Sequence, residues 1–140
     1  MSEIAAILEA LLAETGASRV TLRRGVDDGY AFPVTDEALA AGVASLRDER
    51  SVDLRAQPVA MEVQERGQVV QDDSRAAYED PAYQRMLDVY GGLAAQIVTA
   101  VAKHGEVTAI LSVHQVGSPR SWKEEPAACR RAAERIAALL

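Results

Sequence analysis

Residues 93–116 read LAAQIVTAVAK, HG, EVTAILSVHQV, and this stretch decides the fold. Two runs rich in β-branched residues, Leu93–Lys103 and Glu106–Val116, are separated by His104-Gly105, which is a natural connection for a β-hairpin. Side chains alternate along a strand, so one face of the second run is wholly apolar and the other is mixed. The apolar face comprises Val107, Ala109, Leu111 and Val113, and the mixed face comprises Thr108, Ile110, Ser112 and His114.

The residues before this hairpin predict a helix, two strands and a second helix. Gly16 can end the first helix, Ser18–Arg24 alternates as a strand, and Tyr30–Val34 is a short strand that Pro33 holds near an edge. Thr35 can cap a helix that runs to about Leu46. The first helix is indicated by apolar residues spaced by three and four, namely Ile4, Ile7, Leu8, Leu11 and Leu12.

The middle of the chain predicts a loop at Arg47–Gln57 and then short elements. Pro58–Arg66 alternates like a strand, but Pro58 at a first helical position and Gly67 just past the end favour a helix. Gln68–Gln71 is a short strand, and Asp80-Pro81 opens a helix. That helix carries Tyr83, Met86, Leu87 and Tyr90 at helical spacing.

A final helix follows the hairpin, and the sequence leaves its start open. Ser121 and Glu124 could form a capping box, with the helix starting at Trp122, but Pro126 would then remove a backbone hydrogen bond. A start at Pro126 avoids this cost. The apolar stripe of the helix consists of Cys129, Ala133, Ile136 and Leu140.

The composition indicates one globular domain spanning residues 1–140. The chain is 49% hydrophobic and 26% charged, with a net charge of -6 and a pI near 4.9. Nucleic acid is therefore not an expected partner. The arginines are interleaved with core-like positions and are interpreted as solvated side chains; they are Arg19, Arg23, Arg24, Arg130, Arg131 and Arg135.

Targeting signals are not recognised in the sequence. Met1 leads directly into an amphipathic run, and no stretch of about 18 apolar residues is present, so a cytoplasmic protein without a membrane partner is expected. The lone cysteine, Cys129, cannot form an internal disulfide and fits a reducing compartment.

The order of elements and several short motifs resemble the GAF domain family. The motifs are residues 16–22 (GASRVTL), residues 67–73 (GQVVQDD), and Ser112-Val-His-Gln115 followed by Pro119-Arg120 and Trp122; the last of these is similar to phytochrome-type GAF domains. The resemblance implies an α+β, PAS-like fold. A central antiparallel sheet of about five or six strands would have the terminal helices on one face and a ligand pocket on the other. Relatives commonly have a proline where this chain has Thr99-Ala100, and a Ser or Thr cap where it has Lys123.

The candidate ligand-binding residues lie on the mixed face of the last strand and near the expected pocket. His114 can donate or accept a hydrogen bond, although a histidine satisfied by neighbouring groups is equally consistent with the sequence. Turn-forming roles for the aspartates and core packing for the tyrosines remain open alternatives. The full set is His114, Ser112, Asp72, Asp73, Tyr78, Tyr83 and Tyr90.

The function expected is a stand-alone sensory domain that binds an unknown small molecule and regulates a separate effector protein. The ligand would enter between the sheet and the segments Arg47–Arg66 and Asp72–Tyr90. No cofactor, metal site or catalytic residue is expected. Some GAF domains of this size resemble free methionine sulfoxide reductases, but that cycle needs an attacking and a resolving thiol, and this chain has one cysteine.

The alternative function is a ligandless interaction module whose terminal helices form a homodimer. A dimer is expected under either reading, because the terminal helices carry more apolar residues than one side of a small sheet needs. These residues are Ile4, Ile7, Leu11, Ile136, Leu139 and Leu140.

Overall fold

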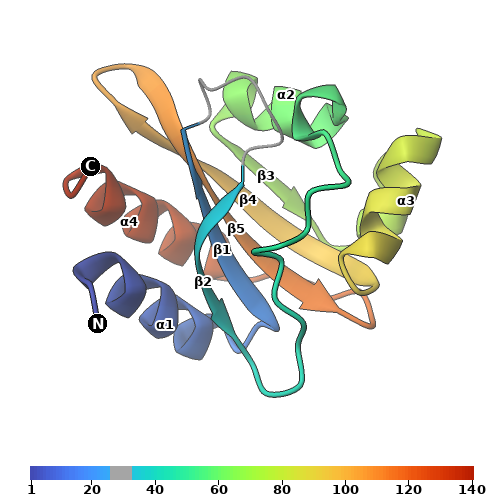
Figure 1. Cartoon of the computed structure of the whole chain (residues 1–140), viewed down its shortest axis with the longest axis horizontal. Helices are drawn as coiled ribbons and strands as arrows, with labels where there is room; N and C mark the ends of the chain where they lie inside the picture. Colours follow the sequence, from blue (N-terminus) through green and yellow to red (C-terminus); the bar gives the residue numbers. More distant parts are fainter. Residues whose placement is uncertain (26–32) are drawn as a thin grey trace.

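A five-stranded antiparallel sheet forms the centre of the protein. The structure is a computed structural model that describes residues 1–25 and 33–140. The strand order in the sheet is β2-β1-β5-β4-β3, and β4 and β5 form the expected hairpin (Figure 1). The strands are β1 (Arg19–Arg24), β2 (Val34–Leu39), β3 (Gln68–Gln71), β4 (Leu93–Lys103) and β5 (Glu106–Val116).

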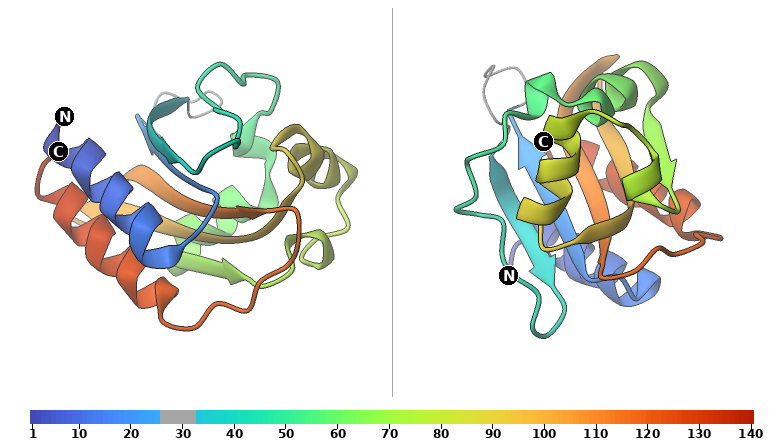
Figure 2. Two further views of the ribbon diagram at one scale, coloured as in Figure 1. Left: turned by 90° about the horizontal axis from the view of Figure 1, so that it is seen from below. Right: turned by 90° about the vertical axis from the view of Figure 1, so that its right-hand side faces the viewer.

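Helices lie on both sides of this sheet. The terminal helices α1 (Glu3–Thr15) and α4 (Glu125–Ala137) run side by side on one face (Figure 2). The other face is covered by α2 (Pro58–Arg66), α3 (Pro81–Val89) and two single-turn 3₁₀ helices, η2 (Leu54–Ala56) and η3 (Ser74–Ala76). The α+β arrangement expected from the sequence is confirmed.

The alternation along β5 explains the two-layered core. Ala109, Leu111 and Val113 are fully buried against α1 and α4, as the apolar face predicted. Ile110, on the mixed face, belongs to a second apolar cluster with residues of α2 and α3. The hairpin therefore supplies the centre of both layers.

Several predicted ends of elements are confirmed. Gly16 has a φ of 64° and ends α1, where a left-handed conformation is needed. Helix α2 begins at Pro58 and ends before Gly67, so the helical interpretation of this ambiguous stretch is correct. Helix α4 begins at Glu125 with Pro126 in its first turn, which is close to the later of the two predicted starts.

The helix predicted from Thr35 to about Leu46 is wrong. Val34–Leu39 is an edge strand that pairs with β1, and Leu39 lies opposite Arg19. The Thr35 hydroxyl donates to the Leu22 carbonyl oxygen at 3.2 Å, and Asp36 forms an ion pair with Arg24. Pairing with β1 overrides the local helix propensity of this segment. Of the predicted strand Tyr30–Val34, residues 30–32 lie outside the described residues.

The apolar residues of the terminal helices are used inside the protein. Ile4, Ile7, Leu11 and Ile136 are each at most 7% exposed, whereas Leu139 is 42% exposed. These four residues pack against the sheet of their own chain. Four of the six apolar residues from which the homodimer was predicted are therefore buried within the protein, and Leu139 remains exposed.

Cys129 lies in the layer between α4 and the sheet and is fully buried. Burial raises the pKa of its thiol to about 12. Among the described residues, no helix is long and apolar enough to cross a membrane.

Truncation of the buried Leu8 in α1 tests the packing of the helix layer. We expect Leu8→Ala to lower the free energy of unfolding by about 2–5 kcal/mol, because the lost side chain leaves a cavity. Urea unfolding followed by circular dichroism measures the change. The control Leu139→Ala, on the same layer but half-exposed, should change it by less than about 0.5 kcal/mol. Equal losses for the two variants would contradict the described packing.

Candidate functional site

A row of buried polar side chains crosses the sheet on the face opposite α1 and α4. The strand registers place Arg19 of β1 beside His114 of β5, His114 beside Gln96 of β4, and Gln96 beside Gln71 of β3. All four side chains are at most 7% exposed. Their common direction follows from the alternation of side chains along paired strands. The Gln96 amide nitrogen donates to Gln71 Oε1 at 3.0 Å.

Arg19 connects four parts of the chain through one guanidinium group. Its Nε donates to His114 Nδ1 at 3.0 Å, and its terminal nitrogens donate to the carbonyl oxygens of Ala44 at 3.1 Å and Tyr90 at 2.8 Å. Burial lowers the pKa of Arg19 to about 10, and the nearby Glu37 opposes this shift. The group therefore remains charged at neutral pH.

The bond from Arg19 fixes the protonation state of His114. Because Nδ1 accepts a hydrogen bond, the proton of the neutral imidazole lies on Nε2. Burial, followed by the positive charges of Arg19 and Arg23, holds the pKa of His114 well below its usual value. The Tyr90 ring stacks on the imidazole with a centroid distance of 6.0 Å. His114 is therefore a neutral hydrogen-bond donor.

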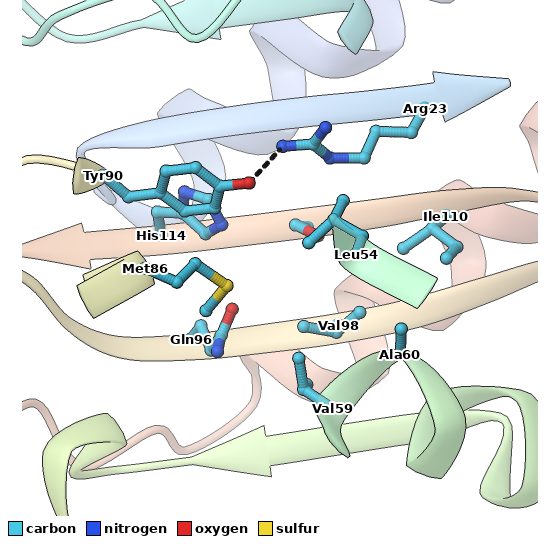
Figure 3. Close-up of a pocket in the computed structure, with 11 residues that line it drawn as sticks. Arg23, Leu54, Val59, Ala60, Met86, Tyr90, Gln96, Val98, Ile110 and His114 are labelled. Carbon is cyan, nitrogen blue, oxygen red and sulfur yellow. Dashed lines mark hydrogen bonds between the residues drawn. The ribbon is translucent and has the colours of Figure 1, made fainter. Parts of the chain in front are cut away.

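Tyr90 is also held at its other end by Arg23. An Arg23 terminal nitrogen donates to the Tyr90 hydroxyl at 3.2 Å, and the guanidinium carbon lies 5.8 Å from the ring centroid (Figure 3). Burial lowers the pKa of Arg23 and raises that of Tyr90. Two buried arginines of β1 thus position the residue that directly follows α3.

A small cavity lies over these residues. Its floor contains Ser112 and His114 of β5, and its cover consists of apolar side chains from η2, α2 and α3 together with Tyr90, which follows α3. The space open to the centre of a water molecule is about 30 Å³, which is room for roughly two waters. The cover, called the lid below, comprises Leu54, Val59, Ala60, Met86 and Tyr90.

Three of the seven predicted ligand-binding residues line this cavity, namely His114, Ser112 and Tyr90. Tyr83 is fully buried beside it, and its hydroxyl lies 3.0 Å from Gln71 Oε1 and 2.8 Å from the Ser74 carbonyl oxygen. Tyr83 therefore extends the polar row without lining the cavity.

The remaining three predicted residues lie outside the cavity. The Tyr78 hydroxyl donates to Glu62 Oε1 at 2.6 Å. Asp72 is exposed, and its carboxylate accepts from the Trp122 backbone nitrogen at 3.3 Å, so it anchors the segment before α4. Asp73 is also exposed and precedes η3 without a capping bond from its side chain.

The sequence interpretation missed the two arginines, because Arg19 and Arg23 were taken as solvated. They are 1% and 5% exposed. The available signal was the alternation of Arg19, Thr21 and Arg23 against Val20 and Leu22. Both faces of β1 are covered: Val20 and Leu22 pack in the layer of α1 and α4, and Arg19 and Arg23 lie beneath the residues that follow β2 and α3. The helix predicted from Thr35 to about Leu46 replaced most of the strand β2, which pairs with β1 in the structure.

A metal centre is not indicated in the part of the chain that the structure describes. No group of three or more His, Cys, Asp or Glu side chains there could hold a metal ion.

The buried His114 predicts a loss of stability at mildly acidic pH. Its folded-state pKa lies below the unfolded value of 6.5, so the unfolded chain takes up the proton first. We expect the free energy of unfolding to fall as pH decreases below about 6.5, by up to about 1.4 kcal/mol per pH unit.

Urea unfolding between about pH 5 and 7 tests this expectation, with His114→Gln as the variant that lacks the titrating group. The variant should lose this part of the pH dependence. The control His104→Asn removes an exposed histidine from the hairpin turn and should retain it; asparagine tolerates the φ of 55° at this position. A His114→Gln variant with the unchanged pH slope would disprove the neutral buried imidazole.

The fold is shared with solved photoreceptor domains, although no family model matches the sequence and no curated protein matches it significantly. The blue-light absorbing form of the PixJ GAF domain from Thermosynechococcus elongatus has a TM-score of 0.78 at 23% identity, over 98% of this chain and 84% of that one. GAF3 from Slr1393 of Synechocystis sp. PCC6803, in its photoproduct state, has a TM-score of 0.81 at 16% identity, over 97% and 89%.

The chromophore-binding domain of a bacteriophytochrome from Stigmatella aurantiaca also superposes. Its TM-score is 0.73 at 18% identity, over 97% of this chain and 52% of that one. The five-stranded antiparallel sheet and the four α-helices of this chain match the fold of these domains. This chain has the GAF fold.

Proposed function

We propose that this protein is a sensory domain that binds a compact small molecule in the cavity beneath the lid and does not catalyse a reaction. The observation that carries the proposal is a pair of polar groups on the cavity floor. The His114 Nε2 proton and the Ser112 hydroxyl have no hydrogen-bond partner within residues 1–25 and 33–140. Buried polar groups are normally paired, so a ligand or water is the expected partner.

The shape of the site favours a ligand with one polar end and an apolar body. The polar end would accept a hydrogen bond from the imidazole of His114, and the apolar body would contact Val59, Met86 and Ile110. The present volume of about 30 Å³ is far below that of a pocket for a large ligand. Binding therefore requires a small ligand and an outward movement of the lid.

A tetrapyrrole is a poor fit to this site. One solved structure with a similar fold is described with bound biliverdin IXa, at 19% identity and a TM-score of 0.78. In this chain the cavity is too small for such a molecule without large rearrangement, and the single cysteine is buried on the opposite face of the sheet. The same burial of Cys129, with its raised pKa, argues against thiol redox catalysis.

Tyr90 gives ligand binding a structural readout. It contributes to the lid, follows α3, and is fixed to β1 through Arg19 and Arg23. A ligand that displaces the lid would disturb these bonds and move the end of α3. The domain would in this way convert occupancy of the cavity into a change at its surface, for an effector protein to recognise.

A thermal-shift screen of small metabolites tests the proposal. A ligand at about 100 times its Kd should stabilise the protein by about 2.7 kcal/mol. Ala60→Leu places extra methyl groups in the cavity and should abolish this stabilisation, whereas Ala77→Leu, on an exposed turn, should not. If no compound stabilises the protein, or if Ala60→Leu binds as well as the original chain, the cavity is not a ligand site.

The small cavity also favours a second candidate, a ligandless module that acts as a homodimer. The exposed side chains of the terminal helices differ in charge: Glu3, Glu9 and Glu14 of α1 are exposed, whereas Arg130, Arg131 and Arg135 outnumber the exposed Glu134 on α4, and Arg131 pairs with Glu14 of the same chain at 3.5 Å. In a two-fold dimer, α1 of one protomer could therefore pair with α4 of its partner. The exposed alanines Ala6, Ala10 and Ala13 would allow close approach.

Light scattering at micromolar concentration tests the dimer. We expect twice the mass of 15.0 kDa and dissociation by Ala10→Arg, which adds bulk and charge to the proposed interface. The control Ala77→Arg, on the other face of the sheet, should remain dimeric. A strictly monomeric mass for the original chain would refute this candidate.

A further inference from the structure

Strand β4 is longer than β3, the strand that pairs with it on the side away from β5. Strand β3 covers only Gln96–Thr99, and the last bond on this side joins the Ala100 backbone nitrogen to the Gly67 carbonyl oxygen at 2.8 Å. In the part of the chain that the structure describes, no strand lies beside this edge at Val101–Lys103. The β4–β5 hairpin accordingly projects past β3 (Figure 1). An uncovered strand edge offers backbone groups for pairing with another chain.

A groove runs along this uncovered edge, between β4 and α4. The space open to the centre of a water molecule in it is about 530 Å³, many times that of the cavity beneath the lid. Besides Gln68, whose amide donates to the Pro126 carbonyl oxygen at 2.8 Å, its lining includes small residues, which allow a peptide backbone to approach closely: Gly67, Thr99, Ala100, Ala102 and Ala133. The groove is thus shaped for an extended chain rather than for a bulky ligand.

Arginines stand on both sides of the groove in a protein whose net charge is -6. Arg66, at the end of α2, is 69% exposed and forms a surface ion pair with Glu62 at 3.4 Å. Arg130, on α4, donates to Gln68 Oε1 at 2.6 Å. A guanidinium has five N–H donors, so both side chains keep donors for a carboxylate. Glu134 is the acidic residue in the lining.

We propose that this groove binds an extended acidic peptide segment of a partner protein, which adds a strand along β4 in line with β3. Backbone hydrogen bonds to the uncovered edge would supply affinity, as in other cases of strand addition. Acidic side chains opposite Arg66 and Arg130 would supply selectivity. The groove lies on the α4 side of the sheet, so this proposal is independent of the cavity and would hold even if no small molecule binds there.

The probe is a displayed library of random peptides long enough to span Val101–Lys103 and the flanking groove. Selection on the original protein should enrich peptides that carry acidic residues at alternate positions. For a synthetic peptide from this set, fluorescence anisotropy should show binding that weakens about tenfold or more in the Arg66→Glu, Arg130→Glu double variant. The matched control, Arg50→Glu with Arg85→Glu, reverses two exposed charges outside the groove and should bind normally.

Two further measurements separate strand addition from simple charge attraction. N-methylation of the peptide backbone removes donors and should also weaken binding about tenfold or more. Nuclear magnetic resonance should place the largest peptide-induced shifts on the amides of Gly67 and Ala100–Lys103.

Several outcomes would overturn the proposal. They are the absence of enriched peptides, enrichment without acidic residues, and equal binding by the two double variants. Unchanged binding after backbone methylation, with displacement by succinate, would instead identify a site for small anions. Peptide-induced shifts confined to α1 and the outer face of α4 would place the contact at the helix layer and exclude the groove.

Discussion

The hydrogen bonds of one buried cation hold the cavity side of this protein together. Arg19 lies at the meeting point of β1, β5, the segment after β2 and the end of α3; β1 carries the arginine, and each of the other three contributes an acceptor. A buried guanidinium is tolerated only when its donors are satisfied, so the four parts must adopt one arrangement for the charge to remain inside. The protonation of His114, the place of Tyr90 and the closure of the lid all depend on this arrangement.

The two faces of the sheet differ in the side chains that pack against them. On the side of α1 and α4, the core is almost entirely aliphatic, with Trp122 and Cys129 among its buried residues. On the other side, a polar row lies beneath short helices joined by exposed segments, including residues 47–53. Regions with fewer buried contacts open at lower cost than the core. The floor of the cavity thus belongs to the central sheet, whereas its cover is built from short separate segments.

Sequence alone predicted the parts of the fold that local pattern determines. The hairpin 93–116, the helix Pro58–Arg66 and the two faces of β5 follow from alternation, from proline and glycine positions, and from apolar spacing. It failed at Val34–Leu39, where helix-favouring residues form an edge strand because β1 needs a partner. The prediction that Arg19 and Arg23 are solvated was wrong for a related reason, since the burial of a side chain on a strand depends on the segments that pack around that strand. Of the candidate site, His114, Ser112 and Tyr90 could be named, whereas the arginines and the small cavity volume depend on tertiary packing.

Because Cys129 is buried, chemical modification of its thiol can measure how often α4 separates from the sheet. It is the one cysteine in the sequence, it lies between α4 and the sheet, and its thiolate form is strongly disfavoured in the folded state. A thiol-specific reagent will therefore modify the protein only in molecules whose terminal helix has come away from the sheet. The rate of modification in dilute denaturant reports how often that separation occurs, without any added label or engineered residue.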